Sequence, residues 1–421
     1  MSIPPRASTL APFGVRAFRF QWPADLATSW AFEMEMIILG WYVLVETRSV
    51  LLLTIFVSLQ HMGTLIAPMF GVMGDRLGHR NVLCGMRAFY GLLATTLMTF
   101  TFLGALTPVH VFVIAGLLGL VRPSDIGMRA ALVADTMPPR LLVGAMGIQR
   151  TTQDSAKVFG ALTGAGLVAL LGMGPAYVVV AGLYAASVVL TLKAGSARAA
   201  SRAPGAGFRV VPTASPWRDL KEGMKYVWTT PRLLAVMCLA FLLNLTAFPI
   251  FNGLLPYVAK EIYFTDQTGL GYMVAGAASG SLTASIVLSR HGSFFPPARL
   301  ILVACVAWYS FLLVFANVPY HYAGIGILFV AGLAQSASQV PMAAMLLRTS
   351  DEQFRGRVMG IRMLAIYGNV PGLLIAGQVI PVIGYPLTAS LYCVFGIVVT
   401  GLIAMRWREH LWRRDAPANS R

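Results

Sequence analysis

Long apolar stretches separated by short polar segments follow one another along the chain. Twelve of these stretches contain about 20 residues, the length that a helix needs to cross the hydrocarbon core of a bilayer. The pattern therefore predicts an all-α polytopic membrane protein with twelve transmembrane helices. The predicted spans are approximately 27–45, 50–70, 82–103, 109–128, 142–171, 174–193, 233–255, 268–289, 300–318, 323–347, 358–380 and 386–405.

The middle of the chain interrupts this pattern. Residues 194–211 are rich in small residues and arginine and cannot span a bilayer, which predicts a cytoplasmic linker. Beyond them, Trp217, Met224 and Trp228 recur at helical spacing among basic residues, so an amphipathic helix is expected. This helix could lie on the inner leaflet or pack as a polar connector under the bundle. The predicted divisions are an N-terminal six-helix bundle (1–193), the linker with its helix (194–232), a C-terminal six-helix bundle (233–405) and a basic cytoplasmic tail (406–421).

The two halves share a short sequence match. The tripeptide Met-Gly-Ile occurs at 146–148 and again at 359–361, and the same offset pairs Gly164 with Gly377. With six spans on each side of the linker, this match suggests two six-helix pseudo-repeats.

Composition and charge agree with a membrane protein. Hydrophobic residues make up 57% of the chain and charged residues 11%, far from the usual values of soluble domains. Lys and Arg gather in alternate connections, and the other side of the membrane receives only Arg48 and Lys260. Because cytoplasmic loops collect basic residues, both termini are predicted inside. This asymmetry explains most of the net charge of +16, so no nucleic-acid partner is expected.

The polar stretch GVMGDRLGHR at 71–80 lies between the second and third predicted spans. It resembles the signature loop of the major facilitator superfamily, with His79 where a second Arg or Lys is common. The resemblance implies a conformational latch, in which Asp75 docks near the start of the span 358–380, at Arg355–Val358. The residues that match the signature are Gly71, Asp75, Arg76, Gly78 and Arg80.

Within the superfamily, the chain looks similar to the branch of bacterial exporters that includes the enterobactin exporter. Three local features carry this resemblance: Arg122-Pro123, the short loop at 133–147, and FRGRVMG at 354–360. The resemblance implies a secondary transporter of the bacterial inner membrane that works as a monomer without a cofactor. Ala161 stands where many exporters carry proline, so uptake remains an alternative to export.

Ionisable residues inside a membrane are costly and usually functional. The acids in predicted spans all lie in the N-terminal half, which places ion coupling there. Glu33 and Glu35 lie about 200° apart around their helix and cannot both face one cavity. One would carry the coupling proton, and the other would pair with Arg122, Arg150 or Lys157; both could also be structural. The proton-coupling candidates are Glu33, Glu35, Arg122, Asp125 and Asp154.

The span 142–171 offers two further features. Arg150, Asp154 and Lys157 follow at four- and three-residue spacing, which suits either a self-neutralised structural network or a proton relay. Gly160, Gly164 and Gly166 are typical of a close-packing seam between helices.

The substrate site is expected where the resemblance implies a central cavity, among the first, fourth, seventh and tenth spans. Polar and aromatic residues on these spans suit an amphipathic or aromatic solute better than a sugar. Each polar residue could instead form an interhelical hydrogen bond. The candidates are Trp30, Asn244, Phe248, Asn252, Gln335 and Gln339.

These features favour proton-coupled export of a small amphipathic molecule, such as a drug, siderophore or metabolite, by alternating access. The expected partners are this substrate, protons and the lipid bilayer. The alternatives are a symporter or uniporter for uptake and, at lower rank, a transport-dead receptor or scaffold. No zinc-protease motif, serine elbow, metal-ligand spacing or Walker loop occurs in the sequence, so neither an enzyme, a metal site nor direct ATP drive is expected.

Overall fold

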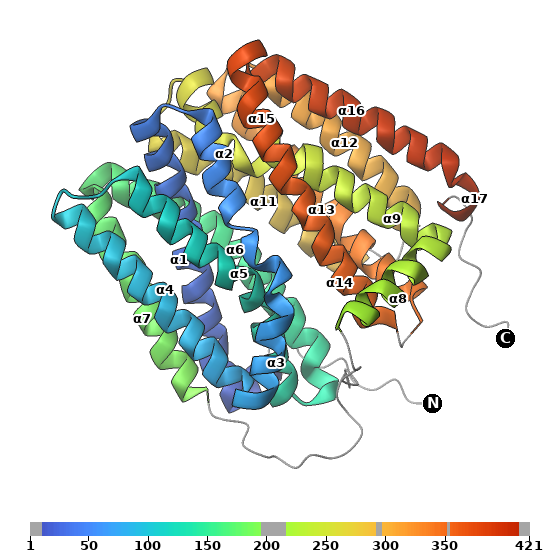
Figure 1. Ribbon diagram of the computed structural model, residues 1–421, viewed down its shortest axis with the longest axis horizontal. Coiled ribbons are helices and arrows are strands. Elements are labelled where there is room, and N and C mark those ends of the chain that lie inside the picture. Colours follow the sequence, from blue (N-terminus) through green and yellow to red (C-terminus); the bar gives the residue numbers. More distant parts are fainter. Residues whose placement is uncertain (1–10, 195–215, 292–296, 352–353, 412–421) are drawn as a thin grey trace. The chain divides into compact units, whose positions relative to one another are not determined.

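The computed structural model describes residues 11–194, 216–291, 297–351 and 354–411 (Figure 1). These residues are helical apart from short connections and contain no β-strand, which confirms the all-α prediction. The helices of the first part are η1 (Ala11–Gly14), α1 (Arg16–Thr47), α2 (Val50–Leu59), η2 (Met62–Leu65), α3 (Ala67–Leu77), α4 (His79–Phe102), α5 (Pro108–Thr136), α6 (Pro139–Leu171) and α7 (Met173–Lys193).

After the linker, a short helix leads into the second series. These helices are α8 (Pro216–Thr229), α9 (Pro231–Leu242), η3 (Leu243–Ala247), η4 (Pro249–Gly253), α10 (Leu255–Tyr257), η5 (Val258–Ile262), α11 (Gln267–His291), α12 (Pro297–Asn317), α13 (His321–Thr349), α14 (Arg355–Ala365), η8 (Ile366–Gly368), α15 (Asn369–Ile383), α16 (Tyr385–Arg406) and α17 (Arg408–Leu411).

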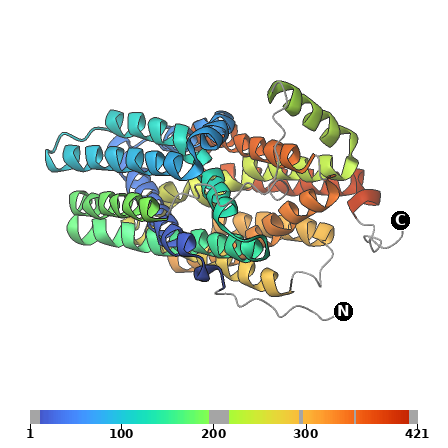
Figure 2. The same ribbon diagram turned by 90° about the horizontal axis from the view of Figure 1, so that it is seen from below.

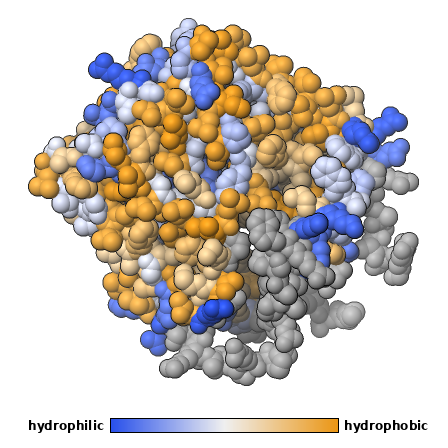
Figure 3. All heavy atoms as spheres, viewed as in Figure 1, coloured by the Kyte–Doolittle hydropathy of each residue, from blue (hydrophilic) through white to orange (hydrophobic). Residues whose placement is uncertain are grey.

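Ten helical stretches in the described part of the chain are long and apolar enough to cross a membrane. They coincide with ten of the twelve predicted spans; the other two predicted spans fall on α1 and on the shorter apolar stretch Val50–Leu65. Many apolar side chains stay exposed, for example Leu170 at 82% and Val382 at 80%. Hydrophobic residues accordingly cover most of the described surface on the face shown in Figure 3, as a lipid environment requires.

The first helix is longer and more polar than the sequence pattern suggests. α1 has 32 residues, begins at Arg16, well before the predicted start near residue 27, and continues through Pro23. Its mean hydropathy is lowered by four acids, of which Asp25 and Glu35 are buried. Because buried carboxylates need partners in a membrane, the packing around α1 determines where polar chemistry can occur.

One compact unit is formed by the described residues within Met1–Arg48, Leu59–Arg209 and Asp266–Ala275. In this unit α1 packs against α6 and α7, and α4 runs beside α7 (Figures 1 and 2). A Cβ atom at Gly164 of α6 would lie 2.9 Å from the Met34 Cα of α1, and one at Gly160 would lie 2.7 Å from the Glu33 Cβ. The predicted seam therefore exists at these two glycines, whereas Gly166 faces open space.

A second unit is formed by the described residues within Ser49–Ser58, Val210–Thr265 and Gly276–Arg421. Here α12 packs against α13 and α16, and α15 packs against η3. A Cβ atom at Gly280 of α11 would overlap the backbone of Phe329 in α13. The two helices can approach this closely only because glycine has no side chain.

The stretch from Pro231 to Ile262 is the least regular of the long helices. Three π-helical segments, η3, η4 and η5, interrupt it, and η4 begins at Pro249. Proline lacks the backbone N–H that continues a helix. π-Helical turns are rare in proteins as a whole, and those that occur are often found at functional sites.

The predicted amphipathic helix is present as α8, which contacts α9 and α14. The rest of the predicted linker, residues 195–215, and the tail from residue 412 onward lie outside the described residues.

Candidate functional site

A buried carboxylate on α1 is the centre of the first polar cluster. Glu35 is 1% exposed, and its Oε2 accepts hydrogen bonds from Arg122 Nη2 of α5 (2.6 Å) and from the Tyr184 hydroxyl of α7 (2.8 Å). Arg122 also donates to the Gln60 side chain (3.1 Å), and its guanidinium carbon lies 3.6 Å from the ring centroid of Phe32. One ion pair thus joins α1, α5, α7 and the turn that follows α2.

The two oxygens of this carboxylate differ in their surroundings. Oε2 has two donors, whereas Oε1 is buried without a hydrogen-bond partner among the described residues. Charged pairs in a low-dielectric interior persist only with good geometry and additional hydrogen bonds, which Gln60 and Tyr184 supply here. The free oxygen is therefore a place where a proton can bind without displacing a donor.

A second polar cluster surrounds Asp25, which precedes Glu35 on the same helix, α1. Arg87 of α4 is completely buried and donates to Asp25 and to the Thr191 hydroxyl of α7. Gln149 Nε2 of α6 donates to the other carboxylate oxygen of Asp25 (2.9 Å). Asp25 therefore connects four helices of the first unit.

Arg129 of α5 extends this cluster. It pairs with Asp125, one turn before it on the same helix, and its Nη1 donates to the Ser29 hydroxyl (2.6 Å) and to the backbone oxygen of Asp25 (3.1 Å). Of the predicted candidates, Asp125 thus pairs with Arg129 of its own helix, whereas Arg122 pairs with Glu35. The two buried carboxylates and two buried arginines of the second cluster balance in formal charge.

Three ionisable residues of this second cluster, Asp25, Arg87 and Arg129, were not among the candidates predicted from the sequence. Arg87 was counted with the basic residues of the cytoplasmic connections although it lies within the predicted span 82–103, and this count is wrong because the structure buries Arg87 in α4. Asp25 was not a candidate because the first span was predicted to begin near residue 27, beyond Pro23. A helix drawn through Pro23 would have placed Asp25 among the acids within the membrane.

Glu33 lies on a different face of α1 from Glu35, as their spacing predicts. It is half-buried against Gly160 of α6, and among the described residues its carboxylate forms no hydrogen bond or ion pair. Of the two glutamates, Glu35 is thus the partner of Arg122.

Two neighbouring groups on α6 form the local pair that their spacing suggests. Arg150 Nε lies 3.3 Å from Asp154 Oδ2, with Asp154 buried and Arg150 mostly exposed. Lys157, the third member of the predicted network, is exposed.

The turn between α3 and α4 carries the predicted latch residues. Gly78 has a φ of +88°, which glycine adopts without strain, and a Cβ atom at Gly74 would lie 2.6 Å from the imidazole of His79. His79 Nδ1 lies 2.6 Å from Asp135 Oδ2 at the end of α5. The contacts of the Asp75 side chain lie outside what the structure describes, so its docking at Arg355–Val358 stays a prediction.

The other latch candidates, Gly71, Arg76 and Arg80, have few described contacts. Gly71 faces open space, Arg76 is exposed, and Arg80 donates to the side chain of Asn81.

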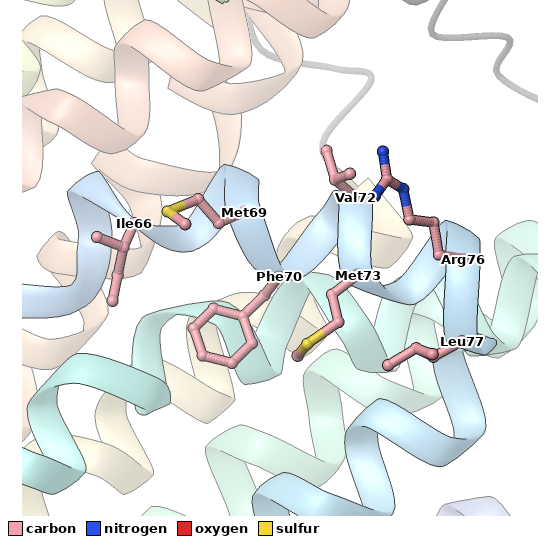
Figure 4. Close-up of a pocket in the computed structure, with 7 residues that line it drawn as sticks. All are labelled: Ile66, Met69, Phe70, Val72, Met73, Arg76 and Leu77. Atoms are coloured by element: carbon pink, nitrogen blue, oxygen red, sulfur yellow. The ribbon is translucent and has the colours of Figure 1, made fainter.

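An open depression of about 590 Å³ runs along this same segment (Figure 4). Its lining is apolar apart from one arginine, and it contains no member of the two ionic clusters. The residues that line it are Ile66, Met69, Phe70, Val72, Met73, Arg76 and Leu77.

Three of the six predicted cavity residues have hydrogen bonds to protein groups on other helices. Trp30 Nε1 donates to the Thr163 hydroxyl of α6 (2.7 Å), and Gln335 Oε1 of α13 accepts from the Ser281 hydroxyl of α11 (2.6 Å). Gln339 accepts a longer hydrogen bond, 3.4 Å, from Arg362 of α14. The alternative of interhelical hydrogen bonds is therefore realised at these positions.

The other three predicted residues lie on the π-helical stretch of the second unit. Asn244 donates to the backbone oxygen of Ala240 (2.8 Å), and Phe248 packs edge-on against Trp308. Asn252 is exposed. Of these three, only Phe248 has a described hydrogen bond or ring contact with another helix.

Comparison with known proteins identifies the family. Residues 7–418 match the family described as transmembrane secretion effector, a branch of the major facilitator superfamily. The chain belongs to this family. No curated protein matches the sequence significantly.

Solved transporter structures share the fold of this family member. The POT family transporter PepTSo has a TM-score of 0.74 at 11% identity, covering 94% of this chain and 99% of its own. The nucleoside transporter NupG has a TM-score of 0.69 at 14% identity, covering 93% of this chain and 99% of its own. A bacterial homolog of the human lysosomal transporter Spinster has a TM-score of 0.67 at 12% identity, covering 99% and 100%. At sequence identities this low, the structural likeness shows a shared fold and does not identify the substrate.

Proposed function

We propose that this chain is a proton-coupled exporter of small amphipathic organic molecules in the bacterial inner membrane, with both termini cytoplasmic. It would work as a monomer by alternating access of the bundles 1–193 and 233–405. The observation that carries the proposal is the buried ion pair of Glu35 and Arg122, together with the hydroxyl of Tyr184. A buried carboxylate with one free oxygen is a proton-binding group whose protonation changes a charge balance inside the membrane.

The proposed coupling step occurs at Glu35, so the glutamate that pairs with Arg122 carries the proton, in place of the other glutamate, Glu33, that the sequence expectation favours. A proton binds Oε1, the oxygen without a partner, and neutralises the carboxylate. Arg122 then keeps Gln60 and the ring of Phe32 but loses its counter-charge. An uncompensated guanidinium in a low-dielectric site is unfavourable, so the proton favours the conformation that gives Arg122 another partner or water. Substrate binding would favour the opposite conformation, and differential affinity for the two conformations is what couples the flows.

The proposed substrate class follows from the half-buried groups outside the ionic clusters. Trp30, Asn244 and Phe248 combine aromatic surface with hydrogen-bonding capacity. The resemblance to the enterobactin exporter branch supports a siderophore, drug or metabolite. Structural neighbours include a nucleoside transporter and a human organic anion transporter, so this fold accepts solutes of several kinds.

Proton-linked uptake, by symport, is the second candidate. Ala161 favours it, because exporters of the resembling type often carry proline at this position. The two directions predict opposite signs of proton movement on addition of substrate.

The test is substrate-triggered proton flux in liposomes. Purified protein is reconstituted under an imposed pH gradient, a panel of amphipathic compounds is added, and internal pH is followed. We expect proton flux in the wild type, loss of flux in Glu35→Gln, and retained flux in Glu33→Gln, the matched change two residues earlier. Flux lost only in Glu33→Gln would move the proton to that residue, flux indifferent to both would move it to Asp125 or Asp154, and no flux with any compound would contradict proton coupling.

A further inference from the structure

Helix α8 is fixed to the second unit by one of its faces. Glu222 Oε2 accepts a hydrogen bond from Arg357 Nη1 of α14 (3.0 Å). The Tyr226 hydroxyl donates to Asp351 Oδ2 and accepts from the Asp351 backbone N–H, both at 3.1 Å. The Tyr226 ring stacks on Phe354, with ring centroids 4.2 Å apart and planes 6° from parallel.

Close packing completes this attachment. Gly223 is buried, and a Cβ atom there would lie 3.0 Å from the Arg357 Cβ. Val227 is 2% exposed. The face of α8 that contains these residues is thus held against the segment that joins α13 to α14.

The opposite face of α8 is left exposed within this unit. Trp228 is 70% exposed and Met224, one turn before it, is 41% exposed. Lys221 and Lys225 lie one turn apart beside them and are also exposed. An apolar strip with lysines along its edge is the pattern of a helix that lies at a lipid surface.

The connection to α9 fixes where this face is. α8 ends at Thr229, and the apolar stretch that is long enough to cross the membrane starts at Pro231. Trp228 is therefore within three residues of a membrane span and must lie near the boundary of the bilayer. Tryptophan is enriched at this boundary, and lysines near it attract anionic headgroups.

We propose that the exposed face of α8 binds anionic phospholipid headgroups. Trp228 and Met224 enter the interfacial layer, and Lys221 and Lys225 pair with headgroup phosphates. Because the other face holds the α13–α14 junction, bound lipid also fixes the position of that junction relative to the membrane surface. This site depends on membrane insertion and not on proton coupling.

The test uses full-length protein in vesicles of phosphatidylcholine alone or of phosphatidylcholine with phosphatidylglycerol. The lipids carry bromine near the glycerol, where it quenches an interfacial tryptophan. The signal of Trp228 is the difference in quenching between the wild type and Trp228→Tyr. We expect this signal to be larger with phosphatidylglycerol, and the increase to be lost in the double variant Lys221→Gln/Lys225→Gln and at high salt. Lys193→Gln, which removes an exposed lysine at the end of α7, should retain the increase.

Three results would overturn the proposal. Absence of Trp228 quenching would place this face away from lipid. Equal quenching in both kinds of vesicle would remove the preference for anionic headgroups. An increase that survives loss of both lysines would assign it to other groups. None of these results depends on the proton flux of the liposome experiment, so failure of one proposal leaves the other standing.

Discussion

A single guanidinium, that of Arg122, meets four groups from three segments of the first unit. Glu35, Tyr184, Gln60 and Phe32 surround it, and each constrains it in a different direction. Arginine suits this position because its planar fork can donate several hydrogen bonds at once while its face stacks on an aromatic ring. Lysine could replace the charge but not this geometry.

The hydroxyl of Tyr184 should matter to coupling. Tyr184→Phe removes a donor to Glu35 and an acceptor for Arg122, so we expect a marked loss of substrate-triggered proton flux, of about tenfold if the hydrogen bonds contribute about 1.5 kcal/mol. Tyr177→Phe is the matched control on the same helix, because its buried hydroxyl has no partner among the described residues. Equal flux in the two variants would contradict the role of Tyr184.

The buried arginine of the second cluster should matter to stability. Arg87→Met leaves Asp25 with less counter-charge, and removing one partner of a buried pair costs about 3–5 kcal/mol. We therefore expect a lower midpoint of thermal unfolding in detergent. Arg16→Met, which removes an exposed arginine at the start of α1, should change the midpoint little. An unchanged midpoint in Arg87→Met would show that Gln149 and Arg129 suffice for Asp25.

At this scale, sequence spacing predicts faces but not partners. The opposite orientation of Glu33 and Glu35 follows from helical geometry alone. The choice of Arg122 for Glu35, and of Arg129 for Asp125, depends on how α1, α5 and α7 pack, which no local pattern encodes. A single acid such as Asp25, which lies between Pro23 and the predicted start of the span, is likewise invisible until the true start of the helix is known.

Among the elements, close helix contacts rest on individual glycines. Gly280 of α11 lies against the backbone of Phe329 in α13, where a methyl group cannot be accommodated without separation of the helices. Gly160 and Gly164 serve α6 in the same way against α1.

Adding one methyl group at such a contact should destabilise the second unit. We expect Gly280→Ala to lower the unfolding midpoint, because the overlap with the Phe329 carbonyl outweighs the gain in helix propensity of about 1 kcal/mol. Gly182→Ala in α7, which faces open space, should keep or raise the midpoint in the same assay. A rise in both variants would show that α11 and α13 can separate at no cost.

The positions of the long apolar helices are the feature of this molecule that the sequence predicts best. Ten predicted spans coincide with long apolar helices because hydrophobic length is a direct signal. The π-helical segments could be anticipated only at Pro249, since a π turn leaves no periodic mark in the pattern of apolar residues. The attachment of α8 through Tyr226 and Glu222 was equally hidden, because both residues are typical of any exposed helix.

At the scale of the whole molecule, charge is distributed unequally. The buried ion pairs that the structure describes all lie in the first unit, on α1, α4 and α5. The described polar groups of the second unit are mainly amides, hydroxyls and aromatic rings, such as Asn244 and Gln335. This division supports proton binding by one half and a greater share of substrate contacts by the other.

The loop at 71–80 is where a single residue should affect both halves. Asp75→Asn keeps the shape of the side chain but removes its charge, so we expect slower transport with unchanged substrate affinity. Transport rate in liposomes and equilibrium binding in detergent, measured on the same preparation, separate the two effects. Transport at the full wild-type rate would remove the latch assignment, and lost binding would make Asp75 part of the substrate site.

The three π-helical segments between Leu243 and Ile262 also bear on how this sequence can change over generations. Each π turn closes its hydrogen bond over one residue more than an α turn. Loss of one residue there can restore a regular turn, whereas the same loss in an α-helical span rotates everything beyond it by about 100°. Deletion of one residue is therefore a route by which this span can acquire a new arrangement of side chains.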